Sequence, residues 1–268
     1  MICPSDKKFG GGTTPTGTIQ ITQNGTVDVT DYATADMAVP NDNTMFNGEL
    51  SGAAIDLVND EVTTLRERCF YNYTALKSAH FGAVTSMSQR VFYGCTGLKR
   101  AYFPKLTTLN QTEQFRGCTQ LNYLDFPVLS SFSSTNTFNG CSALNFIVLR
   151  RTSGIVTLTS TNTFSNTPFL TGNGGGGTIY VPYSLVSNYQ GNSTWSQITY
   201  ATFKSIQENL ATLYLLGVNI DEYRLIVDEL PTTDIDDTKT YWIYVSGTTY
   251  HQYFYGSGSW EQLADITL

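Results

Sequence analysis

The sequence predicts a mainly β protein built around a short solenoid of about five rungs, each 22–26 residues long, with small β modules at both ends and one short helical segment. Three observations predict this class. A seven-residue template recurs at nearly constant spacing through the middle of the chain. The composition includes 17 Tyr and 15 Phe, residues that favour strands. Charged residues make up only 14% of the chain, fewer than helical proteins usually carry.

The repeat has the form Phe-x-x-(Cys or Tyr)-x-x-Leu. Its leading phenylalanines are separated by 22, 23 and 23 residues, and a looser fifth copy begins 26 residues later. A unit of this length cannot bury its own apolar face, so neighbouring units must stack and share one core. Like residues are then expected to lie over like in two columns. These columns are Phe70, Phe92, Phe115 and Phe138, and Leu76, Leu98, Leu121 and Leu144.

Each repeat leucine opens a short alternating run, in which we expect positions one, four and six to face the core. Positions three and five then point outward and form the candidate binding surface. Its residues are Ser78, His80, Arg100, Tyr102, Tyr123, Asp125, Phe146 and Val148. Tyr, Phe and Arg are typical of recognition surfaces. An alternative stays open, because Phe146 and Val148 are too apolar to be left exposed to water. In this alternative, another part of the chain or a neighbouring subunit covers this face.

Three cysteines, Cys95, Cys118 and Cys141, occupy the same repeat position. Stacking predicts a structural ladder of reduced, buried thiols about 5 Å apart per rung. A disulfide between neighbouring rungs is the alternative. Cys69 and Cys3 lie outside this register. The chain has no Cys-x-x-Cys and only two histidines, so we expect neither a metal site nor a cofactor.

The pattern F-x-x-C-x-x-L-x-x-I-x-F-P, with its 23-residue spacing, resembles the BspA-like class of leucine-rich repeats. Residues 92–104 and 115–127 match it most closely, including Pro104 and Pro127. Residues 177–189, followed by Trp195, look like the closing repeat and cap of that family. The resemblance covers roughly residues 55–205. It implies a leucine-rich-repeat solenoid and a recognition role, but no substrate.

The remaining segments are assigned from turn and periodicity signals. Asn24-Gly25 between alternating runs indicates a hairpin. Apolar residues at helical spacing between Phe203 and Leu230 indicate two short helices, the second ended by Pro231. The predicted order is a flexible lead-in (1–16), an N-terminal β-hairpin module (17–48), the solenoid with its cap (49–202), a helical connector (203–230) and a C-terminal three-stranded β module (231–268).

Both terminal modules resemble small β modules of bacteriophage structural proteins. This resemblance implies a non-enzymatic virion protein, such as a head or tail fibre, a decoration protein or a receptor-binding subunit, assembled in the host cytoplasm. The implied partners are other virion proteins and a host cell-surface glycan or protein, and a homo-oligomer, preferably a trimer, is expected. The alternatives are a bacterial cell-surface adhesin of the BspA-like group, which would require export, and a glycan-acting tail enzyme.

Several other classes are disfavoured. The net charge of −7 argues against nucleic-acid binding. No run of 18 apolar residues exists, so no membrane insertion is expected, and residues 1–8 lack the apolar core of a signal peptide. No Ser-His-Asp arrangement or Gly-x-Ser-x-Gly motif is found, so no catalytic residues are expected. The carboxylates between Asp221 and Asp237 indicate solvated surface, with weak calcium binding as the alternative.

Overall fold

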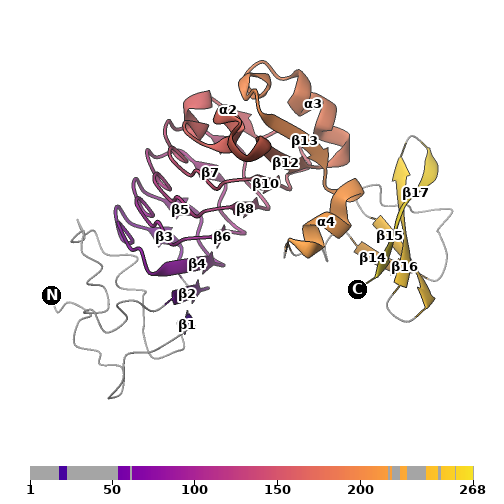
Figure 1. Ribbon diagram of the computed structural model, residues 1–268, viewed down its shortest axis with the longest axis horizontal. Helices are drawn as coiled ribbons and strands as arrows, with labels where there is room; N and C mark the ends of the chain where they lie inside the picture. The colour runs from indigo at the N-terminus through magenta and orange to yellow at the C-terminus, as the bar shows by residue number, and fades with distance from the viewer. Residues whose placement is uncertain are drawn as a thin grey trace.

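The computed structural model describes residues 18–22, 54–60, 62–216, 218, 224–227, 240–246, 249–256 and 258–267. The centre of the chain is a parallel β solenoid, with a small mixed sheet near its C-terminal end (Figure 1). The lead-in, the predicted turn at Asn24-Gly25 and Cys3 lie outside the described residues.

An eight-stranded parallel sheet forms one side of the solenoid. Each rung contributes one strand, and neighbouring rungs pair in register, so that Ser78 lies beside Arg100 and Arg100 beside Tyr123. In sheet order the strands are β1 (Thr18–Thr22), β2 (Ala54–Asn59), β4 (Leu76–Phe81), β6 (Arg100–Tyr102), β8 (Tyr123–Phe126), β10 (Phe146–Leu149), β12 (Gly177–Val181) and β13 (Ala201–Ser205). β1, predicted as the first strand of a hairpin, pairs in parallel with β2 and so extends this sheet.

A second row of two-residue strands runs along the other side of the rungs (Figure 1). Each ends in a buried apolar residue, such as Leu109 or Phe132. The row consists of β3 (Thr64–Leu65) paired with β5 (Ser86–Met87), and of β7 (Thr108–Leu109), β9 (Ser131–Phe132) and β11 (Thr157–Leu158). The core therefore lies between the two rows of strands.

The predicted columns of like residues are confirmed. The repeat leucines and phenylalanines are at most 1% exposed. Ring centroids of successive repeat phenylalanines lie 5.3, 5.2, 5.6 and 5.5 Å apart from Phe70 to Phe164, in stacked orientation. Positions one, four and six of each run face the core, as in Leu121, Leu124 and Phe126. Aromatic contacts at this spacing add to the free energy gained by burying the rings.

The repeat glycine and cysteine have separate physical roles. Gly94, Gly117 and Gly140 have φ of 70°, 75° and 80°, a left-handed conformation that glycine adopts at little cost. The backbone N–H of each donates to the next rung, for example from Gly117 to the carbonyl of Asn139 at 2.8 Å. The cysteine that follows is fully buried, and its thiol donates to a phenylalanine carbonyl of the preceding rung, as Cys118 does to Phe92 at 3.0 Å.

The cysteine ladder contains free thiols. Cys95, Cys118 and Cys141 are all buried and unbridged, so the disulfide alternative is wrong for these residues. Burial raises the pKa of the Cys118 thiol well above its usual value, and the neighbouring thiols of the ladder raise it further. Burial likewise raises the pKa of Cys69, which is also free. Cys69 and Cys118 therefore stay protonated. The thiols of Cys95, Cys118 and Cys141 each donate a hydrogen bond to a buried carbonyl group.

The predicted closing repeat supplies β12 and a helical cap over the last rung. Tyr189 and Trp195 are buried. The indole N–H of Trp195 donates to the carbonyl of Val156 at 2.7 Å, and the N–H of Val156 donates to the phenol oxygen of Tyr189 at 2.8 Å. The cap elements are η5 (Tyr183–Leu185), α3 (Val186–Gly191) and η6 (Trp195–Gln197), and the helical turns before β12 are η3 (Thr161–Phe164), α2 (Pro168–Thr171) and η4 (Asn173–Gly175).

The prediction of two helices in residues 203–230 is wrong in part. Phe203 lies in β13, which pairs with β12 and adds a strand beyond the predicted cap. Among the described residues of this range, only η7 (Gln207–Asn209) and α4 (Leu210–Leu215) are helical, and β14 (Arg224–Val227) is a strand parallel to β15. Short apolar runs fit both the helical and the strand periodicity. Here the pairing with a neighbouring strand determines that residues 201–205 and 224–227 form strands.

The C-terminal sheet has four strands, because β14 joins the three that the sequence predicts. Their order is β14, β15 (Thr240–Ser246), β16 (Thr249–Gly256) and β17 (Ser259–Thr267). This sheet contacts the end of the solenoid. The side-chain amide of Gln252 donates to the backbone carbonyl of Gln207 at 3.1 Å, and the ring centroids of Phe254 and Tyr183 lie 4.8 Å apart. No helix in the described residues is long and apolar enough to span a bilayer.

The aromatic column provides a test of the shared core. Phe115→Ala removes a fully buried ring that stacks on both neighbouring rungs, and we expect it to lower the free energy of unfolding by about 3–5 kcal/mol. The measurement is urea unfolding followed by circular dichroism. Val128→Ala, at a side chain 44% exposed, is the control and should change stability by no more than about 0.5 kcal/mol. Equal effects of the two substitutions would contradict the shared core.

Candidate recognition surface

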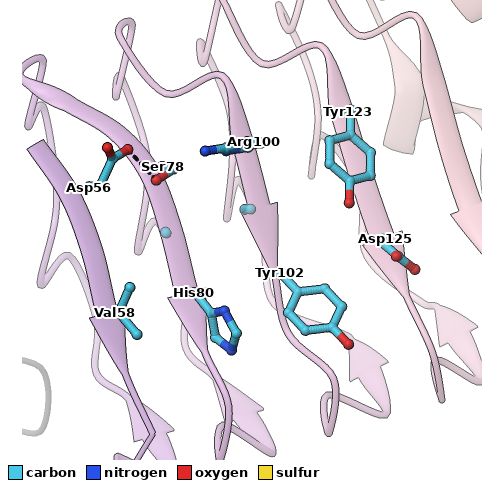
Figure 2. A pocket seen from close by; sticks show the side chains of 10 residues that line it. Asp56, Val58, Ser78, His80, Arg100, Tyr102, Tyr123 and Asp125 are labelled. Carbon is cyan, nitrogen blue, oxygen red and sulfur yellow. Dashed lines mark hydrogen bonds between the residues drawn. The ribbon is translucent and has the colours of Figure 1, made fainter. Parts of the chain in front are cut away.

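The outward face of the eight-stranded sheet carries two rows of side chains that the register fixes. Position three of successive strands gives one row, and position five gives the other (Figure 2). Because neighbouring strands are hydrogen-bonded, side chains within a row are about 4.8 Å apart. The first row is Asp56, Ser78, Arg100, Tyr123 and Phe146, and the second is Val58, His80, Tyr102, Asp125 and Val148.

A hollow of about 390 Å³ lies between these rows on strands β2 to β8. Six of the eight predicted binding residues line it, and Phe146 and Val148 do not. We call it the outward groove, and its side chains are Asp56, Val58, Ser78, His80, Arg100, Tyr102 and Tyr123, with Asp125 at its end (Figure 2). The groove is thus lined by aromatic rings together with hydrogen-bond donors and hydrogen-bond acceptors.

Polar contacts hold the first strands of the groove. The hydroxyl of Ser78 donates to the carboxylate of Asp56 (Figure 2). The imidazole Nε2 of His80 lies 3.5 Å from a carboxylate oxygen of Asp60, and its ring meets that of Tyr102 edge-on at 5.1 Å. Ser78 and His80 therefore face separate carboxylates, Asp56 and Asp60, and do not form the serine–histidine pair of a serine nucleophile.

Asp125 is not an open binding residue, although its sequence position predicts one. It is 1% exposed and forms a bidentate ion pair with Arg150, whose Nε lies 2.7 Å and Nη2 2.5 Å from its two carboxylate oxygens. Arg150 is itself buried and directly follows β10. The two side chains satisfy each other's hydrogen bonds and neutralise each other's charge. Asp125 therefore forms the end of the groove but offers no free negative charge to a ligand.

Val148 is also covered, and Phe146 partly so. Val148 and Tyr180 form a buried cluster with Ile206, Leu210, Leu213 and Val218, against which Phe146 and Tyr123 pack. The alternative reading of the sequence, in which another part of the chain covers this face, therefore holds for its C-terminal rungs. Residues 206–216, which contain α4, and Val218 lie on this side of the sheet (Figure 1). None of the residues that the structure describes covers the outward groove on the earlier rungs.

Tyr123 stands at the boundary between the covered and open parts. Its ring stacks on Phe146 at 5.0 Å and lines the groove. Burial raises the pKa of its phenol, and the negative charge of Asp125 raises it further. Burial also raises the pKa of Tyr180. The Tyr123 hydroxyl thus remains neutral and able to donate a hydrogen bond at physiological pH.

Sequence reasoning missed several residues around the groove. Asp56 and Val58 lie on β2, in a rung that lacks the Phe-x-x-Cys template, although the alternation in Ala54–Asn59 signals it. A second hollow next to the groove is also lined by Lys77, Lys99 and Leu216. Both lysines directly follow a repeat leucine, so aligning the repeats would have identified them from the sequence. No cluster of three or more metal-ligating side chains occurs within the described parts of the chain.

The fold defines a parallel β solenoid of the leucine-rich-repeat class. Residues 42–171 match the family BspA type Leucine rich repeat region, in six copies. The chain therefore carries a BspA-type leucine-rich repeat region, and such a region supports a role in recognition or adhesion. No curated protein and no solved structure matches the chain.

The buried ion pair can be tested by a double-mutant comparison. Arg150→Met leaves Asp125 charged in a dry site, and we expect a loss of about 3–5 kcal/mol in the free energy of unfolding. The double variant Asp125→Leu with Arg150→Met removes both charges and should be more stable than the single variant. Urea unfolding measures all three proteins. A double variant at least as unstable as Arg150→Met would contradict mutual neutralisation.

The covering segment can be tested separately. Leu213→Asp places a charge in the cluster around Val148, so we expect amide hydrogens of residues 206–216 to exchange about tenfold faster or more. Hydrogen exchange with mass spectrometry gives the rate for this peptide. Thr212→Asp, at the exposed neighbouring position, is the matched control. Similar exchange in both variants would show that the cluster does not hold the segment.

Proposed function

We propose that this chain is a non-enzymatic recognition protein that holds its ligand in the outward groove. The observation that carries the proposal is the open hollow on β2 to β8, where Arg100, Tyr102 and Tyr123 are presented from neighbouring rungs. Tyr and Arg supply much of the binding energy in known interfaces, because they combine large contact area with directional hydrogen bonds. The rigid sheet beneath them presents these groups with little loss of conformational freedom on binding.

The groove is better suited to binding than to hydrolysis. A glycan-cleaving enzyme commonly needs two carboxyl groups that face each other across the bond to be broken. Of the two carboxylates that line the groove, Asp125 is buried against Arg150, and Asp56 accepts a hydrogen bond from Ser78. This supports a role without catalysis over a glycan-acting tail enzyme.

For the biological setting, the proposal is a bacteriophage virion protein of the fibre, decoration or receptor-binding type. The resemblance of both terminal modules to phage β modules supports it. In this setting one terminal module anchors the chain, as a homotrimer, to other virion proteins, and the repeats face a host glycan or protein. The second candidate is a bacterial cell-surface adhesin, which the BspA-type repeat region itself favours. Mass spectrometry of purified particles and of cell envelopes distinguishes the two by where the chain is found.

The binding role is tested on the full chain labelled with a fluorophore and mixed with a panel of intact bacterial cells. Arg100→Ala with Tyr102→Ala, both on β6, should reduce binding to the recognised cells by about tenfold or more, because both side chains line the groove. The melting temperature should change little, since both side chains are at least partly exposed.

The matched control is Tyr93→Ala with Arg116→Ala. It removes the same residue types from the turn side of the stack, where the Arg116 guanidinium lies 5.7 Å from the Tyr93 ring centre. The control should bind cells as the unaltered chain does. Binding that survives in the Arg100 and Tyr102 variant, or that is lost equally in the control, would reject the groove as the binding site.

A further inference from the structure

A second hollow, of about 290 Å³, adjoins the outward groove and shares Asp56, Arg100 and Tyr123 with it. The residues that line only this second hollow differ in charge and polarity from those of the groove. Lys77 and Lys99 bring two further positive charges, and Phe146 and Leu216 form an apolar side. We call this hollow the basic corner. It is lined by three cations and one carboxylate, in a chain whose net charge is −7.

The three cations of the basic corner carry no ion pair with any residue that the structure describes. By contrast, Arg90, Arg116 and Arg150 each contact a carboxylate. The stack itself brings the cations together: the backbone N–H of Lys99 donates to the carbonyl of Lys77 at 2.9 Å, so the lysines lie on adjacent rungs, and Arg100 follows Lys99. Three cations beside the single carboxylate of Asp56 leave the site with a net positive charge, which favours an anion there.

The groove that continues from this corner is suited to sugar rings. A pyranose has an apolar face of C–H groups and a rim of hydroxyls, and a tyrosine has an apolar ring and one hydroxyl. Tyr102 and Tyr123 line the groove, and Asp56, Ser78 and His80 provide acceptors and donors for hydroxyls. The groove crosses four strands, or about 14 Å from three strand spacings, which is longer than one sugar ring.

A peptide is less well matched to this site. Extended peptides commonly bind by adding a strand to an open sheet edge, where backbone groups are unpaired. The groove lies on the face of the sheet, and β4, β6 and β8 pair with strands on both sides. Recognition here must come from side chains, as it does for a ligand that presents hydroxyls and charge.

We propose, on the basis of the proposed function, that the groove and the basic corner together bind an acidic oligosaccharide. Its carboxylate or phosphate group lies among Lys77, Lys99 and Arg100, and its sugar rings lie along Tyr102 and Tyr123. Arg100 pairs with either anion through two parallel N–H bonds, and the lysines act as point charges.

The test measures binding of the full chain by calorimetry to four probes. These are the trimer of galacturonic acid, the neutral galactose trimer, maltotriose phosphorylated at O6, and hexaglutamate peptide. At least one of the two acidic sugars should bind tenfold or more tightly than the neutral trimer, and raising the salt concentration from about 0.1 M to 1 M should weaken it, because screening shortens from about 10 Å to 3 Å. The preferred acidic sugar identifies the carboxylate or the phosphate source.

The variant Lys77→Gln, Lys99→Gln, Arg100→Gln should lower the affinity for that acidic sugar by about tenfold or more. Its matched control is Lys105→Gln, Arg151→Gln, Lys204→Gln, which removes the same charge from cations outside both hollows and should bind normally. Equal binding of acidic and neutral sugars, binding of neither acidic sugar, equal or tighter binding of hexaglutamate, or equal loss in the control would overturn the proposal.

These outcomes separate the acidic ligand from the proposed function. If cell binding depends on Arg100 and Tyr102 but no acidic sugar binds, the groove is a recognition site for a different ligand. If the acidic sugar binds and the Lys77, Lys99 and Arg100 variant binds it equally well, the sugar occupies another surface. The acidic-ligand proposal fails in both cases, and only the first leaves the groove as the recognition site.

Discussion

The in-register parallel pairing of successive rungs is the constraint on which the rest of the structure depends. Backbone hydrogen bonds join each rung to the next on the sheet side and on the turn side. A residue type that fits at one position therefore fits at the same position one rung later, about 4.8 Å away. This explains why phenylalanine, glycine and cysteine recur together. The ring fills the core, the glycine allows the left-handed turn, and the thiol satisfies a carbonyl of the previous rung.

The same register that builds the core also orders the outward face, and the chain then divides that face in two. Over the later rungs, residues 206–216 and Val218 bury Val148 and Tyr180. Over the earlier rungs, no described segment covers the groove on β2 to β8. The Asp125–Arg150 pair marks the division, because it neutralises a carboxylate that would otherwise face the groove. A rigid, partly covered sheet thus leaves one open patch for recognition.

Sequence periodicity predicts what depends on the repeat and little of what depends on long-range contacts. The columns, the reduced cysteines and the inward positions all follow from spacing, and the structure confirms them. The burial of Asp125 depends on Arg150, 25 residues away, which stands at the repeat position of Pro104 and Pro127 and therefore has no counterpart that signals an ion pair. The cover over Val148 comes from a segment outside the repeats, and the strands at 201–205 and 224–227 depend on pairing partners that local patterns do not show.

The proposed acidic-sugar site requires that equivalent residues of successive rungs lie directly over one another. The Asp125–Arg150 ion pair and the cover over Val148 require the same stacking. The sulfur atoms of Cys95, Cys118 and Cys141 report on this most directly, since one comes from each of three successive rungs. Anomalous diffraction from sulfur in crystals of the full chain locates them without reference to any assumed structure. In-register stacking predicts that the sulfur sites of these three cysteines, among the nine sulfur atoms of the chain, lie in a nearly straight row, about 4.8 Å from one to the next. Sites scattered through the molecule, or paired at the length of a disulfide bond, would contradict it.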